Sequence, residues 1–264
     1  MSHDPMVFIN PKKIDNSHIL DAYSSIKARV AELNATSAII IGADHYILFS
    51  PRCLPQLLIG MGEVSGPVDE LPGLPNINIP ENRELARAIF DYSQESGFDL
   101  AVSKTLAVDH SVGVPAQLCL PEGGQVKAVP VYMASGVSPT IRMARAFKFG
   151  EMLKQAVEHI ETDERVVVMG SGGISHWVGT GEMGKTNRNF DEWVLEMFLA
   201  GNADALIQLN DADIQAEAGN GGMEIRHLLA VMGAVPEASS NLILYDAWPG
   251  GVTGLGFAER ITGL

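Results

Sequence analysis

Cysteine is almost absent from this sequence of 264 residues: only Cys53 and Cys119 occur, and neither belongs to a Cys-x-x-Cys pair or a Cys/His tract. Neither a disulfide framework nor a structural zinc site is therefore indicated. A free cysteine behaves as a small apolar side chain, so we expect both thiols to lie in the core.

Positive charge is also scarce, since 18 Lys and Arg residues stand against 32 Asp and Glu, for a formal net charge of −14. Such a surface is unsuited to nucleic-acid phosphates or an anionic membrane. No apolar run approaches the roughly 18 residues of a membrane span, and the first residues lack the apolar core of a signal peptide. We therefore expect a cytoplasmic protein that binds a small ligand, with neither nucleic acid nor membrane as partner.

Apolar runs of strand length alternate with amphipathic helical stretches along the chain. Buried strands are predicted over 37–43, 99–108, 126–133, 165–170 and 240–247, and helices over 19–33, 143–157, about 189–199, and 225–232. This alternation predicts an α/β fold, a single domain over residues 1–264 with a central, mostly buried β-sheet flanked by helices. Residues 51–80 are rich in Pro and Gly, so we expect a long excursion over the surface.

The stretch GTGEMGKT at residues 179–186 fits the pattern of a nucleotide-binding P-loop letter for letter. A P-loop, however, follows directly on a buried strand, and the nearest strong strand here ends at Gly170. About 80 residues follow the stretch, too few for the further strands of a P-loop domain. We therefore interpret it as a polar loop that leads into the next helix.

Three of the seven histidines, His45, His110 and His176, come directly after apolar runs. In α/β sheets the residues just beyond the carboxyl ends of strands converge on one crevice, so these imidazoles are candidates for a shared site. A single such histidine would more often be structural. The small residues of GSGGIS at 170–175 allow close approach beside His176, but they lack the spacing of a dinucleotide loop.

Glu224 and His227 form a Glu-x-x-His pair at the start of the last amphipathic helix. The pair is half of a di-iron bundle motif, but no second half is present. The His-Glu-x-x-His of zincins and the Gly-x-Ser-x-Gly elbow of hydrolases are also missing. His227 shares a helix face with Glu224 and is a candidate contact of the site. We expect His159 to be solvated and assign no role to His18.

Five motifs occur in a fixed order: SHDP around His3, GADHY around His45, VDHSVGVP around His110, GSGGISH ending in His176, and GNGGMEIRHLLAVMGAV around Glu224. In this order the chain resembles the extradiol ring-cleaving dioxygenases of the protocatechuate 4,5-dioxygenase β-subunit superfamily, over essentially its whole length. The run SHWVGTGEMGKTNRNFD resembles that family's stretch after the catalytic histidine, where a variable loop precedes Asn-x-x-Phe-Asp. The P-loop match is then coincidental.

The resemblance implies that His3, His45 and Glu224 bind a non-haem Fe(II). Two imidazoles and one carboxylate occupy one face of the metal and leave the other positions open, as oxygen-activating iron sites require. It also implies that His176 is the general base toward the substrate hydroxyl and that His110 exchanges protons with the substrate or an oxygen intermediate. No organic cofactor is implied.

Two acids precede site histidines directly. Asp44 and Asp109 are candidates to orient the imidazoles of His45 and His110, although ordinary turn or capping roles are equally open. Family members begin with a strand that leads into the first metal histidine, whereas two residues precede His3 here. Either the natural start lies upstream of Met1, or the iron is held loosely, or activity is reduced, because a ligand near a terminus must be packed to stay in place.

The resemblance implies a small aromatic substrate of the catechol type together with O₂, and many relatives act on carboxylated rings such as protocatechuate or gallate. Lys185, Arg188 and Arg226 are candidates to pair with such a carboxylate, and are equally well explained as surface charges. We expect either a homo-oligomer or a complex with a small partner subunit. Two alternatives stay open: a non-catalytic metal-binding or protein-interaction member of the superfamily, and a hydrolase that uses zinc-activated water.

Overall fold

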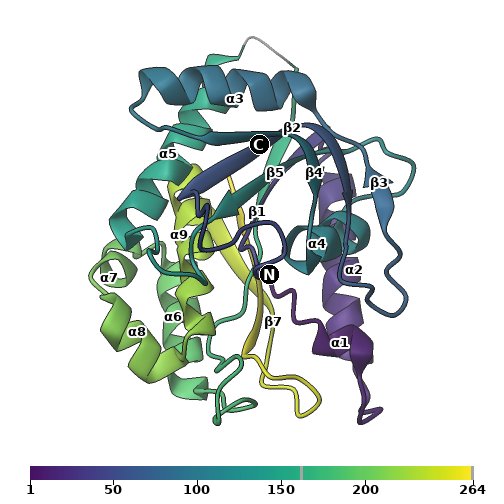
Figure 1. The fold of residues 1–264 in the computed structure, drawn as a ribbon, viewed down its shortest axis with the longest axis vertical. Coiled ribbons are helices and arrows are strands. Elements are labelled where there is room, and N and C mark those ends of the chain that lie inside the picture. Colours follow the sequence, from purple (N-terminus) through teal and green to yellow (C-terminus); the bar gives the residue numbers. More distant parts are fainter. Residues whose placement is uncertain (161–162, 263–264) are drawn as a thin grey trace.

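Residues 1–160 and 163–262 are described in the computed structural model of this chain. Its strands are β1 (Ser37–Gly42), β2 (Leu57–Gly66), β3 (Ile77–Ile79), β4 (Ala101–Ala107), β5 (Lys127–Met133), β6 (Val166–Gly170), β7 (Ser239–Asp246) and β8 (Leu255–Ile261). Its helices are α1 (Met6–Ile9), α2 (Ser17–Glu32), α3 (Arg83–Glu95), α4 (His110–Cys119), α5 (Met143–His159), α6 (Arg188–Ala200), α7 (Ala203–Ile207), α8 (Asp211–Ala218), the 3₁₀ turn η1 (Gly221–Glu224) and α9 (Ile225–Ala234) (Figure 1).

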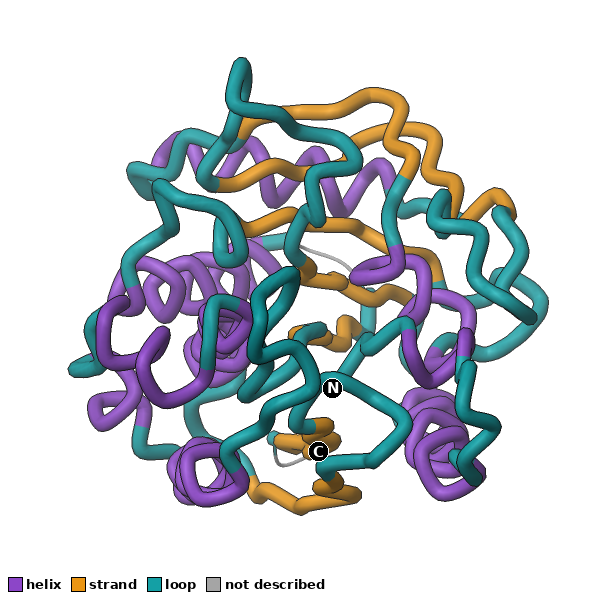
Figure 2. The backbone as a smooth tube through the Cα atoms, turned by 60° about the horizontal axis from the view of Figure 1, so that its bottom comes forward, coloured by secondary structure: helices purple, strands orange, loops and turns teal. Residues whose placement is uncertain are grey.

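The first six strands form one mixed sheet. β1 is parallel to β5 on one side and to β6 on the other. β5 then runs antiparallel to β2, which also pairs in parallel with β4 and antiparallel with β3. Figure 2 shows these strands stacked through the middle of the molecule, with helices on both sides.

Both faces of the sheet are covered, which explains why its central strands read as continuous apolar runs. Successive side chains of a strand point to opposite faces. Ile39 and Ile41 of β1 therefore pack into the core on the side of α5 and α9, while Ala38 and Ile40 pack on the side of α2 and α4. All four side chains are fully buried.

The expected α/β fold with a central sheet flanked by helices is confirmed. The predicted strands over 37–43, 126–133 and 165–170 are β1, β5 and β6, and the four predicted helices are α2, α5, α6 and α9. The stretch 179–186 lies in an irregular, largely exposed segment before α6, as expected. Cys119 is buried, and His159 is exposed on α5.

Four expectations about burial are wrong. Residues 51–80 are not a surface excursion, because they contain β3 and β2, whose first four residues are buried. The strand predicted over 99–108 is β4, which is mostly exposed because, among the described strands, it pairs with β2 alone. The strand predicted over 240–247 is β7, which pairs with β8 in a separate two-stranded sheet and is at most half-buried. Cys53 is exposed.

One edge of β6 is open within the described part of the chain. β6 ends the strand order, and no described strand pairs with its outer edge. An apolar channel of about 460 Å³ runs along this edge, between β6, α9 and β8. Beside it the N-terminal amino group of Met1 donates to the carbonyl of Gly170, and the N–H of Gly172 donates to the carbonyl of Met1, both at 2.9 Å.

Across residues 1–160 and 163–262, no helix combines the length and the apolar character needed to cross a membrane.

Candidate active site

The structure brings together all five residues that the sequence singled out. His45 follows β1, and His176 follows β6, where the carboxyl ends of parallel strands meet at one edge of the sheet. His110 is the first residue of α4, and Glu224 is the last residue of η1, directly before α9 rather than within its first turn. His3 lies just before α1.

The carboxylate of Glu224 lies at the centre of the group. Its Oε1 atom is 3.5 Å from Nε2 of His3 and 3.5 Å from Nε2 of His45. Its Oε2 atom is 3.8 Å from Nε2 of His176 and accepts the backbone N–H of Gly173 at 2.8 Å. Two donor atoms that share one metal ion at about 2.1 Å lie no more than about 4.2 Å apart, so this spacing fits a common ion.

The imidazoles of His3, His45 and His110 each have a protein group within hydrogen-bonding distance of Nδ1. Nδ1 of His3 lies 2.8 Å from Oγ of Ser171, and Nδ1 of His45 lies 2.8 Å from a carboxylate oxygen of Asp109. Nδ1 of His110 lies 3.0 Å from the carboxylate of Asp69. Such contacts fix the ring orientation and leave Nε2 free to bind a metal or substrate.

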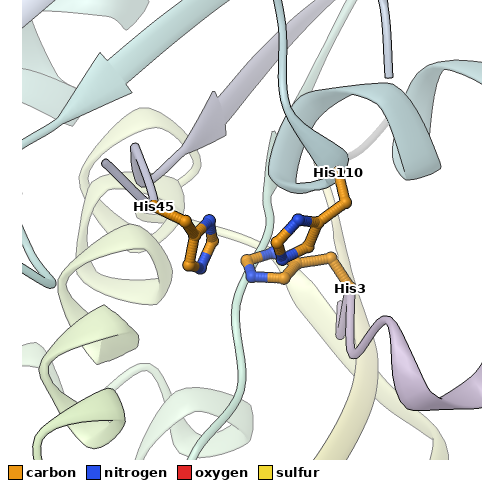
Figure 3. A group of neighbouring side chains, drawn as sticks. All are labelled: His3, His45 and His110. Carbon is orange, nitrogen blue, oxygen red and sulfur yellow. The ribbon is translucent and has the colours of Figure 1, made fainter. Parts of the chain in front are cut away.

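His3, His45 and His110 each bring one ring nitrogen within 4.8 Å of the others, which makes them a second possible set of three ligands (Figure 3). The rings of His45 and His110 stack at a centroid distance of 4.2 Å and an interplanar angle of 27°, whereas His3 stands at 87° to His45. A ring nitrogen binds a metal in the plane of its ring, so an ion in the plane of His45 lies away from the plane of His110. The geometry therefore favours Glu224 over His110 as the third ligand.

The charged groups of the site change one another's pKa values. Burial favours a neutral carboxyl at Glu224, but the charges and hydrogen bonds of His3 and His45 hold its pKa well below the ordinary value. Burial likewise opposes a charged ring at His45, yet the hydrogen bonds and charges of Asp109 and Glu224 raise its pKa to about 10. The site thus favours a positive charge beside Glu224, and a divalent cation on neutral imidazoles would supply it.

His3 and His176 have the opposite tendency. Burial lowers the pKa of His3 to about 4, although the charge of Glu224 opposes the shift. Burial also lowers the pKa of His176, whose side chain is 9% exposed. Both rings are therefore neutral near pH 7, which suits a ligand and a proton acceptor.

His176 is confined on two sides by glycines. A Cβ atom on Gly221 would lie 2.1 Å from its Nε2 atom, and one on Gly173 would lie 2.7 Å from its Cε1 atom. No larger residue fits at either position without displacing the ring. Its Nδ1 atom is buried and has no hydrogen-bond partner among the described residues.

The segment that carries His3 is tightly packed. Ser2, His3 and Asp4 are almost completely buried, and the hydroxyl of Tyr23 donates to the carbonyl of Ser2 at 2.9 Å. The carboxylate of Asp4 accepts the backbone N–H groups of Met6 at 2.8 Å and Val252 at 3.1 Å. These contacts meet the requirement that a ligand near the chain terminus be held in place.

Sequence reasoning missed two residues that orient imidazoles. Asp69 lies in the Pro- and Gly-rich stretch 51–80, for which the pattern predicts a surface excursion. Ser171 belongs to GSGGIS, whose small residues predict close approach beside His176 and no hydrogen bond to His3. Asp109 contacts a site histidine as expected, but the ring that it orients is that of His45. Of the two alternatives for Asp44, the ordinary turn role holds, because its carboxylate accepts the backbone N–H groups of Leu48 and Phe49.

None of the three cations proposed to pair with a substrate carboxylate has a free guanidinium or ammonium group facing the histidines. Arg226 is completely buried, and its nitrogens donate to the carbonyls of Ile141 and Met223 and to the carboxylate of Asp211. Lys185 pairs with Glu182 and lies over the ring of Trp177, and Arg188 pairs with Glu192.

The fold and the site together define a class of protein: an α/β enzyme with a histidine- and carboxylate-lined centre at the carboxyl end of its sheet. The family model described as "Catalytic LigB subunit of aromatic ring-opening dioxygenase" matches residues 1–254. The chain belongs to this family and is thus a ring-cleaving dioxygenase of the extradiol type, acting on an aromatic substrate with O₂.

Curated relatives carry the name 2,3-dihydroxyphenylpropionate/2,3-dihydroxicinnamic acid 1,2-dioxygenase. The relative from Comamonas testosteroni is 27% identical over 97% of this chain and 94% of its own length. That from Photorhabdus laumondii is 23% identical over 89% and 86%, and that from Rhodococcus globerulus is 28% identical over 67% of this chain but only 55% of its own length. The crystal structure of uncharacterized protein JW3007 from Escherichia coli K12 shares the fold, with a TM-score of 0.58 at 13% identity over 90% of this chain and 91% of that one.

Proposed function

We propose that this chain is an Fe(II)-dependent dioxygenase that cleaves a catechol-type ring beside its pair of hydroxyl groups, with His3, His45 and Glu224 as the metal ligands. The observation that carries the proposal is the position of the Glu224 carboxylate, one oxygen of which faces both Nε2 atoms at 3.5 Å. Two imidazoles and a carboxylate are the donor set of oxygen-activating non-haem iron. Iron in this set would supply one-electron chemistry with O₂ and a positive charge beside the ionised substrate.

His176 is the proposed general base. Its ring is neutral because burial lowers its pKa, it lies beside the ligand carboxylate, and its Nδ1 atom has no partner in the described protein. A neutral imidazole at this position can take the proton of a substrate hydroxyl and return it later in the reaction. Glycine at positions 173 and 221 leaves the space that the ring occupies.

His110 is the proposed second proton-exchanging group. Its Nδ1 atom faces the carboxylate of Asp69, so the proton of the neutral ring resides there and Nε2 accepts. The stacking of its ring on His45 supports a position beside the proposed metal.

The substrate class follows from the relatives' name. A 2,3-dihydroxyphenylpropionate is a catechol with a carboxylated side chain, and we propose a substrate of this class. A panel of substrates that differ in this side chain tests the class.

The test is oxygen uptake by protein reconstituted anaerobically with Fe(II) and then given 2,3-dihydroxyphenylpropionate, protocatechuate, gallate or catechol, while the yellow ring-opened product is followed. Uptake in step with product is the expected result. In parallel, His176→Gln should lower turnover by about 10²- to 10⁴-fold with metal content unchanged. His159→Gln, which alters an exposed histidine on α5, is the matched control.

Three outcomes would contradict the proposal. Ring cleavage by His176→Gln at the wild-type rate would remove His176 from the chemistry. Turnover that continues without O₂ would assign the centre to a hydrolase instead. Metal binding without oxygen uptake across the panel would point to a non-catalytic member of the family.

A further inference from the structure

His227 is a completely buried histidine on α9 that the proposed reaction does not use. Its Nδ1 atom lies 2.6 Å from the carbonyl oxygen of Ser171, and its Nε2 atom lies 2.8 Å from Oγ of Ser135. A carbonyl oxygen only accepts hydrogen bonds, so Nδ1 carries the proton. Nε2 must then accept the hydroxyl hydrogen of Ser135, and both ring nitrogens are satisfied.

The residue that His227 holds is the one that orients His3. Oγ of Ser171 lies 2.8 Å from Nδ1 of His3. The backbone N–H of Ser171 donates to the carbonyl of Ile41 on β1 at 2.9 Å. Ser171 is thus fixed on one side by β1 and on the other by His227, while its hydroxyl is directed at the imidazole of His3.

These contacts close a loop through the proposed metal site. Glu224 and His227 lie one helical turn apart, His227 holds Ser171, Ser171 holds His3, and Nε2 of His3 faces Glu224 at 3.5 Å. We propose that His227 is a positioning residue that sets the orientation of His3 relative to Glu224 by fixing the carbonyl of Ser171. The proposal rests on the assignment of His3 and Glu224 as ligands of one metal ion.

Close packing alone would bring the 170–173 segment to α9 but would not fix the direction of this carbonyl. A Cβ atom on Gly172 would lie 2.8 Å from Cβ of Glu224, and one on Gly170 would lie 2.7 Å from the carbonyl oxygen of His227. The segment therefore lies directly against the helix. The hydrogen bond from His227 is the directional contact that reaches the carbonyl of Ser171, beside the one from the N–H of Gly173 to Glu224. Directional partners of metal ligands typically change metal affinity by about 10- to 100-fold.

The test is a double-mutant cycle on metal affinity, with Co(II) as an absorbing probe and no substrate present. His227→Leu should raise the dissociation constant for Co(II) by about 10- to 100-fold. His3→Ala should raise the dissociation constant further. In the His3→Ala background the ring that Ser171 orients is missing, so His227→Leu should change the dissociation constant by less than about threefold. His227→Asn, whose amide can still donate to the carbonyl of Ser171, should restore most of the affinity.

Ser135→Ala is the matched control, since it removes the other partner of the ring and leaves the contact with Ser171 in place. An equal effect of His227→Leu with and without His3 would overturn the proposal, as would a loss as large in Ser135→Ala. If His3→Ala leaves Co(II) binding unchanged, the ligand assignment itself is wrong. The cycle measures metal binding alone, so it separates the two proposals. If the cycle shows coupling between His227 and His3 but the wild-type protein opens no aromatic ring, the proposed function is wrong and the role of His227 still holds.

Discussion

The carboxylate of Asp109 lies 2.8 Å from the Nδ1 atom of His45, and the same oxygen accepts the backbone N–H of His45 at 3.1 Å. Asp109 is completely buried, and its other oxygen accepts the hydroxyls of Ser111 and Tyr132. One carboxylate therefore fixes both the backbone and the ring of His45. The Nε2 atom of that ring is consequently directed at Glu224.

The first prediction is that Asp109→Asn weakens metal binding by about 10-fold or more, because the neutral amide does not raise the basicity of His45 as a carboxylate does. Titration of the metal-free protein with Co(II) measures the change. Asp44→Asn is the control, because Asp44 precedes His45 in the chain yet bonds only to the loop backbone that follows. Equal affinity in the Asp109 variant and the wild type would contradict the role given to this carboxylate.

The second prediction concerns the space around His176. Gly221→Ala should lower turnover by about 100-fold, because the added methyl lies 2.1 Å from Nε2 of His176 and must displace the ring, and misplacement of a catalytic group by about 1 Å has this effect. Gly181→Ala adds a methyl to an exposed loop where nothing lies within 4 Å, and should leave turnover unchanged. Steady-state kinetics at matched metal content would decide, and an unaffected Gly221 variant would show that the ring has room to move.

Local pattern was enough to predict the central part of the fold. After their first residues, Ser37 and Lys127, β1 and β5 are continuous apolar runs because both faces of the sheet are covered. The helices α2 and α5 keep helical spacing because one face of each is buried. The site histidines at strand ends were recognisable for the same reason, because the end of a parallel strand is identifiable from the strand itself. Motif order then supplied His3 and Glu224, which have no such local signal.

The missed strand β2 shows where pattern fails. Its Gly60 and Gly62 suggested a loop, but the glycines are there because neighbouring strands come too close for a side chain. A Cβ atom on Gly62 would lie 2.0 Å from the carbonyl oxygen of Lys104, and one on Gly60 would lie 2.7 Å from Pro130. The contact between Asp69 and His110 could not be predicted either, because the two residues are 41 positions apart and tertiary packing brings them together.

The third prediction is a pH dependence of stability caused by His227. Burial lowers the pKa of His227, and Arg226 adds to the shift while the charge of Glu224 opposes it. The unfolded chain, with a histidine pKa of about 6.5, then binds more protons than the folded one. The stabilising contribution is therefore complete above about pH 6.5 and is lost as the pH falls, by up to about 1.4 kcal/mol per pH unit.

Urea unfolding of the metal-free protein at several pH values between about 5 and 8 measures this dependence. His227→Asn, which does not titrate, should show a shallower decline in the free energy of unfolding below about pH 6.5 than the wild type. Parallel curves for the two proteins would mean that His227 becomes protonated as readily in the folded state as in the unfolded one.

The fourth prediction concerns the open edge of β6. Val166, Val168 and Val231 line the channel beside this edge, and the contacts of Met1 with Gly170 and Gly172 already have the pattern of strand pairing. An engineered extension of five alternating Val and Ala residues before Met1 should therefore continue along β6 as a further strand. We expect the burial of its side chains to outweigh the ordering of its backbone by on the order of 1 kcal/mol, which should raise the melting temperature by about 2 to 4 °C.

An extension of five Gly and Ser residues is the control, because it has the same length and the same peptide bond at Met1 but no apolar side chains for the channel. Thermal unfolding of both fusions compares them directly, and hydrogen exchange of the β6 amides reports whether the new strand pairs. Equal melting temperatures would mean that the channel does not accept a strand. Protection of Val166 and Val168 only in the Val and Ala fusion would place the added strand on this edge, because these amides are slowed only when a neighbouring backbone accepts their hydrogens.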